Sequence, residues 1–289
     1  MKKIFISSLI LSSILLVGCG SDDDTKDDSK QSVDAVLSKS EAASGTPSGV
    51  DFNNKTSLRL KREQKVNKMV LKMSENFYKE ETAACSDGGA LSYDAVNKKI
   101  SYSKCIDYNS ETQLYEYHDG VMQLSQDEES VAFSNYYEEL DYLNNPDTGI
   151  YWHIDVLFSK ENNIENSLID GEMKSYKNGY YIEEEKFSKL TIKENTVNKK
   201  WFIKGGYSYK GGCLDENHIY NTKETDWLVE DKDNSNYWSS GTLYIDNATY
   251  RYNNLDVTVE KEDKKGIFRQ QELIDELERK KNSTDCSIK

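Results

Sequence analysis

The chain has 289 residues and a formal net charge of -14 at pH 7. Nucleic-acid phosphates are held by clustered Lys and Arg side chains, so a chain this acidic is not expected to bind nucleic acid. Anionic lipid headgroups would also repel it, so the folded body is not expected to lie on a membrane surface.

The first segment, residues 1–18, has the pattern of an export signal. Two lysines precede an apolar run over residues 4–17 that is too short to cross a membrane as a helix. The tetrapeptide Leu16-Val17-Gly18-Cys19 resembles the lipobox of bacterial lipoproteins. This resemblance implies cleavage before Cys19 and acylation of Cys19, and Gly20 in the second mature position favours the outer membrane. The expected location is the bacterial cell envelope, with the membrane contacted through this N-terminal lipid. A cleaved secretory signal that happens to contain Cys19 is the alternative.

Residues 19–56 are rich in Ser, Asp, Lys, Gly and Asn and poor in large apolar side chains. Such a composition cannot bury enough apolar surface to offset the entropy lost on ordering, so we expect a flexible acidic tether. Its aspartate clusters lack the ligand spacing and the central glycine of a calcium loop, so no metal site is expected there.

The segment 57–80 is predicted to be an amphipathic helix. Its apolar residues recur at helical spacing and fall on one stripe: Val66, Met69, Val70, Met73 and Phe77. We expect the stripe to pack on the body that follows. A helix lying on the membrane is the alternative.

In residues 81–265 the hydrophobic pattern has a period of two, because β-branched and aromatic residues alternate with polar ones. Short clusters of Asn, Asp, Gly and Lys separate these alternating segments. Asn178-Gly179 is a strong hairpin signal, because both central positions of a type I′ turn need positive φ. Successive strands without helical interludes predict a mainly β fold, an extended antiparallel sheet arranged as a meander or a sandwich.

A degenerate glycine-centred repeat is indicated within this region. Gly120, Gly171, Gly206 and Gly241 each follow a short strand pattern and precede another, and the last three are 35 residues apart. Glycine inside a strand pattern is typical of a β-bulge or bend. The repeat predicts a small unit of strands used again along one sheet.

The last segment, residues 266–289, is predicted to contain a second amphipathic helix. Ile267, Leu273, Ile274 and Leu277 lie on one side of a helical wheel, and charged residues cover the rest. This helix should cap an end of the sheet or cover part of its apolar face.

Four cysteines remain besides Cys19: Cys85, Cys105, Cys213 and Cys286. An even number in an exported chain predicts disulfides, and four cysteines permit three pairings. Cys85 and Cys105 flank a predicted hairpin, which favours a disulfide between them. Cys213 and Cys286 are then left to form the second disulfide. No two are spaced as Cys-x-x-Cys and no histidine stands at ligand spacing, so neither a metal nor a cofactor is expected.

No motif points to catalysis. The three histidines, His118, His153 and His218, are isolated within or beside strand patterns. Nucleophile elbows, phosphate-binding glycine loops and His-Glu-x-x-His are absent from the sequence, although a site built from scattered carboxylates stays open. We therefore expect a non-enzymatic structural or interaction protein.

Recurring aromatic residues suggest one alternative, a binding module for a glycan or a protein that uses an aromatic sheet face. The residues chosen for that face are Tyr244, Tyr250, Tyr252 and Trp238, near the last strands. If these side chains fill the core instead, they carry no binding role.

Overall fold

The computed structural model describes residues 35–43, 82–94, 96–110, 112–126, 130–139, 141–233 and 237–283. The predicted export signal, the predicted acylation site Cys19, the predicted helix over 57–80 and Cys286 lie outside these ranges. Among the described residues, no helix is both long enough and apolar enough to span a membrane.

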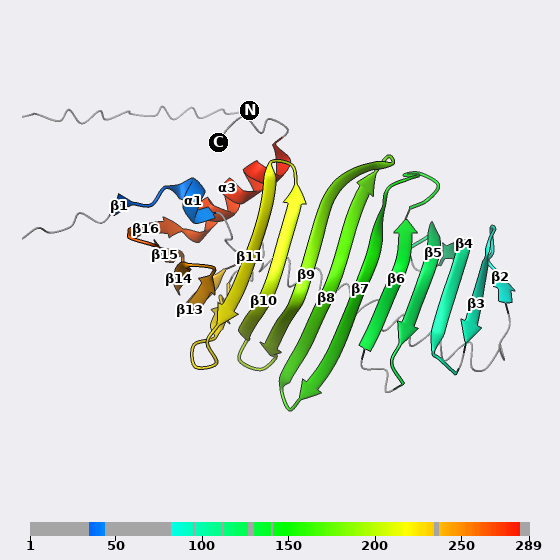
Figure 1. Cartoon of the computed structure of the whole chain (residues 1–289), viewed down its shortest axis with the longest axis horizontal. Helices are drawn as coiled ribbons and strands as arrows, with labels where there is room; N and C mark the ends of the chain where they lie inside the picture. The colour runs from blue at the N-terminus through cyan, green and yellow to red at the C-terminus, as the bar shows by residue number, and fades with distance from the viewer. Residues whose placement is uncertain are drawn as a thin grey trace, which may run out of the picture. The chain divides into compact units, whose positions relative to one another are not determined.

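The described chain is mainly β and forms one large sheet (Figure 1). Its strands are β1 (Ala35–Val36), β2 (Thr82–Ala84), β3 (Ala90–Asp94), β4 (Lys99–Asn109), β5 (Leu114–Leu124), β6 (Ser130–Glu139), β7 (Gly149–Glu161), β8 (Ile164–Lys177), β9 (Tyr180–Asn195), β10 (Lys200–Gly211), β11 (Leu214–Thr222), β12 (Leu228–Glu230), β13 (Trp238–Ile245), β14 (Ala248–Asn253), β15 (Asp256–Lys261) and β16 (Lys264–Arg269).

The sheet is an antiparallel meander. From β2 to β11 each strand pairs with the next one along the chain, and the order continues through β13, β14, β15 and β16, while β12 pairs with β10 and β13. Within the described residues the two-residue pairing of β1 with β16 is the one parallel contact. The prediction of a mainly β fold with an extended antiparallel sheet is confirmed, and of the two arrangements left open the structure has the meander.

Strict alternation along β7 separates the two faces of the sheet. Trp152, Ile154 and Val156 are 1–2% exposed, whereas His153 and Asp155 between them are exposed. We call the face that carries Trp152 the inner face and the opposite one the outer face. Large apolar side chains of most strands gather on the inner face, including Ile100, Met122, Phe133, Tyr136, Ile169, Phe187, Leu190, Leu243 and Val259.

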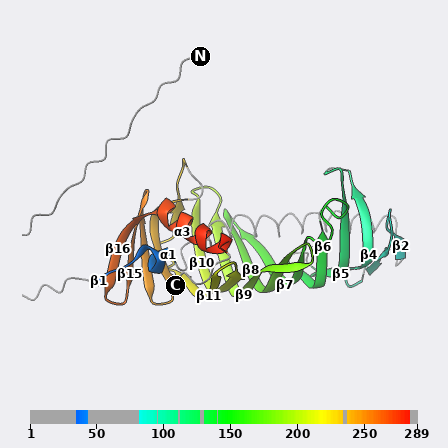
Figure 2. The ribbon, with the colours of Figure 1, turned by 90° about the horizontal axis from the view of Figure 1, so that it is seen from above.

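The C-terminal helix α3 (Gln270–Asn282) packs beside the short helix α1 (Lys39–Ala43) on one side of the sheet, toward the β16 end (Figure 2). Leu273 and Leu277 of α3 are buried, as the helical pattern predicts. The Gln270 side chain donates to the Trp238 carbonyl at 2.7 Å and accepts from the Trp238 N–H at 3.0 Å, which fixes the start of α3 to β13.

Ile267 differs from its predicted place on this helix. It lies in β16 and is 69% exposed, because the pairing of β16 with β15 continues to Arg269 and the helix starts only at Gln270.

Residues 35–43 are ordered, although the sequence placed them in the tether. Ser38 and Glu41 form a capping box: the Glu41 N–H donates to Ser38 Oγ at 3.2 Å and the Ser38 N–H to Glu41 Oε2 at 3.1 Å. Leu37, Ala42 and Ala43 are buried. Three apolar residues next to this capping box are enough to pack the segment against the folded body. They were not predicted because composition was averaged over the whole of residues 19–56.

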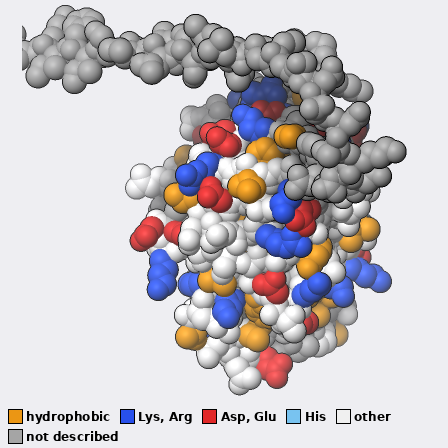
Figure 3. Space-filling model, turned by 90° about the vertical axis from the view of Figure 1, so that its left-hand side faces the viewer, with side chains coloured by type: hydrophobic (Ala, Val, Ile, Leu, Met, Phe, Trp, Pro, Cys, Tyr) orange, Lys and Arg blue, Asp and Glu red, His pale blue; other side chains and the backbone are white. Residues whose placement is uncertain are grey.

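Charged side chains of both signs are interspersed at the β16 end of the sheet (Figure 3). Ion pairs join Arg251 to Glu260, Lys265 to Glu260, and Arg269 to Asp256 across neighbouring strands. Exposed pairs of this kind contribute little stability each, but charged side chains discourage pairing with another sheet edge.

Bulges interrupt the strands at the predicted glycines. Gly120, Gly171 and Gly241 have positive φ, and in the third unit the positive φ belongs to Gly205 instead of Gly206. At Gly171, where φ is +127°, an added Cβ would lie 2.3 Å from the carbonyl oxygen of His153, so the neighbouring strand comes too close for any side chain. These glycines therefore permit the backbone approach that the bulges require.

An aspartate precedes two of these glycines and accepts a hydrogen bond from the bulged neighbouring strand. Asp119 accepts a hydrogen bond from the Lys104 N–H and Asp170 accepts one from the Lys189 N–H, each at 3.1 Å. Lys104 and Lys189 both have positive φ, near 49° and 48°, so their N–H groups are turned out of the regular ladder. In each Asp-Gly dipeptide, the glycine leaves room for the neighbouring strand to approach. The aspartate accepts a hydrogen bond from the N–H group that the bulge turns out of the ladder.

Candidate functional site

The aromatic residues chosen from the sequence do not form an exposed ladder. Tyr250, Tyr252 and Trp238 are 2%, 5% and 1% exposed. The register pairs Leu243 with Tyr250, which places these tyrosines on the inner face beneath the helices. Tyr244 alternates with buried neighbours, is half-buried, and lies beneath Lys223, whose Nζ is 4.6 Å from the ring centroid.

Another set of tyrosines comes together on the outer face. We call it the tyrosine string: Tyr142, Tyr117, Tyr137, Tyr176 and Tyr181. The successive ring centroids are 5.5, 6.1, 6.2 and 6.3 Å apart. Tyr142 comes from the β6–β7 loop, and the other four come from β5, β6, β8 and β9.

Alternation against buried neighbours puts the string on the outer face. Tyr136 is 2% exposed on the inner face, so Tyr137 after it points outward. His118 is directed inward, with Nδ1 2.8 Å from Tyr136 Oη, so Tyr117 before it also points outward. A Tyr-Tyr doublet in a strand must send one ring to each face, and this was the sequence signal for an outward tyrosine.

The β6–β7 loop anchors the string through Glu139. This carboxylate accepts hydrogen bonds from Tyr137 Oη at 3.0 Å and from the Asp147 N–H at 3.1 Å. The Asp147 carbonyl in turn accepts from the Gly179 N–H of the β8–β9 turn at 2.8 Å. Burial raises the pKa of Tyr137 above its usual range, and its hydrogen bond to Glu139 adds to this. The phenol therefore stays protonated and keeps donating.

The β9 end of the string is the most accessible. Tyr181 is 44% exposed, and its neighbours Tyr180 and Ile182 are 77% and 45% exposed. Because side chains alternate along a strand, Tyr180 and Ile182 point to the opposite face, and Tyr181 is the exposed ring that belongs to the string.

A network of charged groups borders the string on the same face. Lys174 Nζ lies 2.8 Å from Glu172 and 3.4 Å from Glu184, and Lys186 pairs with the same two carboxylates. Lys174 also lies 5.8 Å from the ring centroid of Tyr151. The hydrogen bond to Glu172 raises the pKa of Lys174, so the lysine remains charged.

Beyond this network the outer face has a shallow hollow of about 460 Å³. Polar side chains line it, among them His153, Asp170, Glu172, Ser188 and Asn217. Gly171 and Gly206 also line it and contribute no side chains, which leaves the backbone accessible. The string, the charged network and the hollow adjoin one another, since Glu172 belongs to both the network and the hollow.

The inner face contains a carboxylate cluster that sequence reasoning missed. Tyr207 Oη donates to Glu185 at 3.2 Å, and Tyr209 Oη and Ser175 Oγ each donate to Glu183 at 3.0 Å. Burial, followed by the charge of Glu183, raises the pKa of Glu185 to about 7. These groups satisfy one another, so the cluster is a structural polar network between β8, β9 and β10.

The raised pKa of Glu185 predicts a pH-dependent stability. Folded Glu185 keeps its proton up to about pH 7, whereas the unfolded chain releases it near pH 4.3. The unfolded state thus binds fewer protons in this window, and stability falls as pH rises through it, by at most about 4 kcal/mol. Glu185→Gln should match the parent's melting temperature at pH 4.5 and exceed it at pH 8, measured by circular dichroism.

Glu161→Gln is the matched control, because Glu161 is exposed at the end of β7. Its melting temperature should track the parent at both pH values. An equal gain for Glu185→Gln at pH 4.5 and pH 8 would mean that the ionisation of Glu185 has no part in stability.

His218 is held between two acidic residues. Its Nδ1 lies 2.7 Å from Asp246 and its Nε2 3.2 Å from Glu216. Burial lowers the pKa of His218, but the two hydrogen bonds outweigh it, so the net pKa is raised. Both ring nitrogens are occupied, so His218 fixes β11 to the β13–β14 turn.

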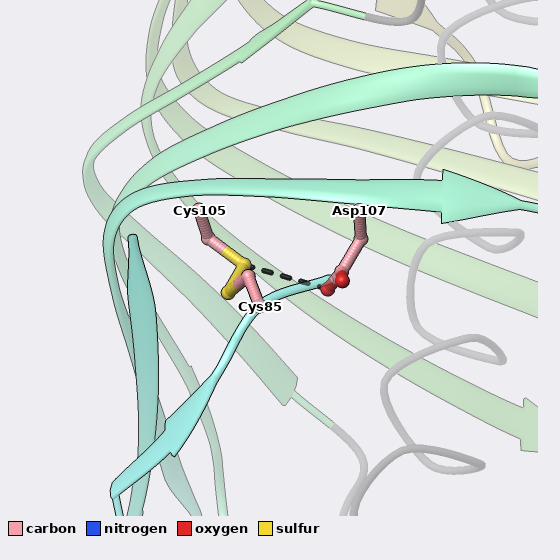
Figure 4. A group of neighbouring side chains, drawn as sticks. All are labelled: Cys85, Cys105 and Asp107. Carbon is pink, nitrogen blue, oxygen red and sulfur yellow. Dashed lines mark hydrogen bonds between the residues drawn. A yellow bond between two sulfur atoms is a disulfide. The ribbon is translucent and has the colours of Figure 1, made fainter. Parts of the chain in front are cut away.

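Cys85 and Cys105 form a disulfide, as predicted (Figure 4). Their Cα atoms are 5.5 Å apart, and Asp107 Oδ2 lies 3.4 Å from the Cys105 sulfur. In the described residues these three form the one cluster with metal-ligand spacing. Because its sulfurs are bonded to each other, no thiolate is available there for a metal.

Cys213 is also disulfide-bonded. Its N–H donates to the Lys280 carbonyl at 3.1 Å, and its sulfur lies 3.2 Å from the Ser283 carbonyl oxygen. Cys213 therefore lies at the C-terminal end of α3, which is where the Cys213–Cys286 pairing requires it. That pairing stays a prediction.

Comparisons of the sequence with protein-family models and curated proteins, and of the fold with solved structures, find no match.

Proposed function

We propose that this protein is a lipid-anchored, non-enzymatic interaction protein of a bacterial envelope and that the tyrosine string is its contact surface. The observation that carries the proposal is the ring-to-ring continuity of five tyrosines from four strands and a loop on the outer face. Aromatic side chains offer large contact area at low entropic cost, which is why they dominate binding surfaces.

The anchor part of the proposal rests on the lipobox-like residues 16–19 and on the short apolar run before them. Two or three acyl chains on Cys19 would hold the protein at the membrane, since each buried methylene contributes about 0.8 kcal/mol. The variant Cys19→Ala should leave membranes in a high-salt wash, as followed by immunoblotting. Retention in the membrane pellet would contradict the anchor.

The buried polar groups favour binding over catalysis. The Glu183–Glu185 cluster is engaged by tyrosine and serine hydroxyls, and His218 is engaged by two carboxylates. Because these acidic and basic groups are already hydrogen-bonded to one another or to hydroxyl groups, we assign them a structural role. The outer face, by contrast, presents accessible rings beside a polar hollow.

Binding can be tested on detergent-washed envelopes of the producing bacterium, using the mature full-length protein purified in detergent. The variant Tyr181→Ser should lose at least about 90% of its co-sedimentation, because loss of one binding hot spot costs about 2 kcal/mol or more. Its melting temperature should stay within a few degrees of the parent, since the Tyr181 side chain is 44% exposed.

Ile267→Ser is the matched control, an exposed apolar residue on β16 at the far end of the sheet. It should co-sediment like the parent. If Tyr181→Ser binds as well as Ile267→Ser does, the string is not the contact surface.

A further inference from the structure

We propose that the ligand of the tyrosine string is an uncharged oligosaccharide chain that crosses the strands and reaches the polar hollow. This inference rests on the proposed function and specifies its ligand. It follows from the length of the string, the groups beside it and the charge of the chain.

The string is long enough for several sugar rings. It runs from β5 to β9, which is four strand spacings, or about 19 Å at the usual distance between neighbouring strands. The rings follow one another across the strands without a gap. A linear oligosaccharide offers a repeated C–H face along its length, and such faces stack on the electron-rich faces of aromatic rings.

Hydroxyl-binding groups adjoin the rings. The Lys174–Glu172–Glu184–Lys186 network lies beside Tyr151, and the hollow adds the carboxylate of Asp170, the amide of Asn217 and the hydroxyl of Ser188. Sugars need this combination, in which apolar faces meet rings while hydroxyls meet planar polar side chains in directional hydrogen bonds.

The placement of charge disfavours a protein ligand. The centre of a protein interface is typically apolar and depleted of charged residues, which stay at its rim. Here the ion pair of Lys174 and Glu184 joins the two strands that carry Tyr176 and Tyr181. These partly exposed ionised groups would need costly desolvation under a protein partner, whereas a hydrated glycan can leave them partly solvated.

The net charge of the chain disfavours acidic polysaccharides. At -14 overall, the protein would repel polymers that carry carboxylates, sulfates or phosphates. An uncharged glycan is not repelled, and its binding should not depend on salt. We therefore expect the same co-sedimentation at low and at high ionic strength.

Chemical treatment of the envelopes tests the inference. Periodate cleaves the vicinal diols of sugars, and protease removes wall proteins, so the two treatments destroy different ligands. For the full-length protein in detergent, we expect at least a tenfold loss of binding after periodate and less than a twofold change after protease. Neutral oligosaccharide fragments released from the same envelopes should compete, with longer fragments at least tenfold more potent than monosaccharides.

Tyr181→Ala should bind the longer fragments at least tenfold more weakly, whereas Tyr244→Ala, a half-buried tyrosine of β13 distant from the string, should bind like the parent. Loss of binding after protease but not after periodate would overturn the glycan inference and leave the proposed function standing. Envelope binding that survives in both the Tyr181→Ser and the Tyr181→Ala variants would overturn the proposed function itself.

Discussion

Gly171→Ala should lower the free energy of unfolding by at least about 3 kcal/mol. The new Cβ would lie 2.3 Å from the His153 carbonyl oxygen and 2.6 Å from the Ile154 Cα, and φ at this position is +127°. Both contacts are to backbone atoms of β7, so relief requires the strand itself to move. Urea titration of the full-length protein, followed by tryptophan fluorescence, measures the loss.

Gly179→Asn is the matched control for this substitution. Gly179 also has positive φ, +76°, but it lies in the β8–β9 turn, where the nearest atom to an added Cβ is 3.8 Å away. Asparagine tolerates this conformation, so the cost should stay within about 1 kcal/mol. If Gly171→Ala proves as stable as Gly179→Asn, the close approach at the bulge is not a requirement of the fold.

Loss of the Cys85–Cys105 disulfide should cost about 3 kcal/mol. The bridge closes a loop of 20 residues, and the chain-entropy relation gives that magnitude for a loop of this length. The double variant Cys85→Ala/Cys105→Ala avoids a free thiol, and its melting temperature should fall by about 6–12 °C in calorimetry. The bridge holds β2 and the turn after it against β4, so the loss should appear at that edge of the sheet.

Reduction of the parent protein separates the two bridges. A reducing agent breaks every disulfide, so the reduced parent should melt below the double variant, because Cys213 is bonded as well. A double variant that melts like the oxidised parent would show that the Cys85–Cys105 bridge adds no stability to the native sheet.

The sequence was sufficient to predict strands but not their faces. A period of two over long segments has one physical cause, a pleated strand with one buried side, so the antiparallel meander followed directly. The residue types at Asn178-Gly179 likewise predicted a hairpin turn, and in the structure both residues have positive φ.

Bulges explain why the candidate site was not predicted. In β6, Phe133 and Tyr136 are both buried although they stand an odd number of residues apart, and Phe187 and Leu190 show the same in β9. Each bulge inserts one residue and reverses the alternation beyond it. Counting by two from Phe133 would send Tyr137 inward, whereas the structure sends it outward to meet Tyr117 and Tyr176.

The misplaced tyrosines have a related cause. Tyr250 and Tyr252 share a face in any register, as expected, but alternation alone cannot say which face the rest of the chain covers. That depends on α1 and α3, which come from distant parts of the sequence. Tyr250 Oη donates to the Ala42 carbonyl at 3.1 Å, a contact between residues 208 positions apart.

Fluorine NMR of the full-length protein labelled with 3-fluorotyrosine tests the binding surface most directly. Single Tyr→Phe variants assign the resonances, and solubilised envelope glycan is the titrant. We predict shifts or broadening for Tyr137, Tyr176 and Tyr181 of the string, while buried Tyr250 and Tyr252 stay unchanged. Saturable binding that leaves every string resonance unmoved would contradict the assignment of the outer-face tyrosines as the contact surface.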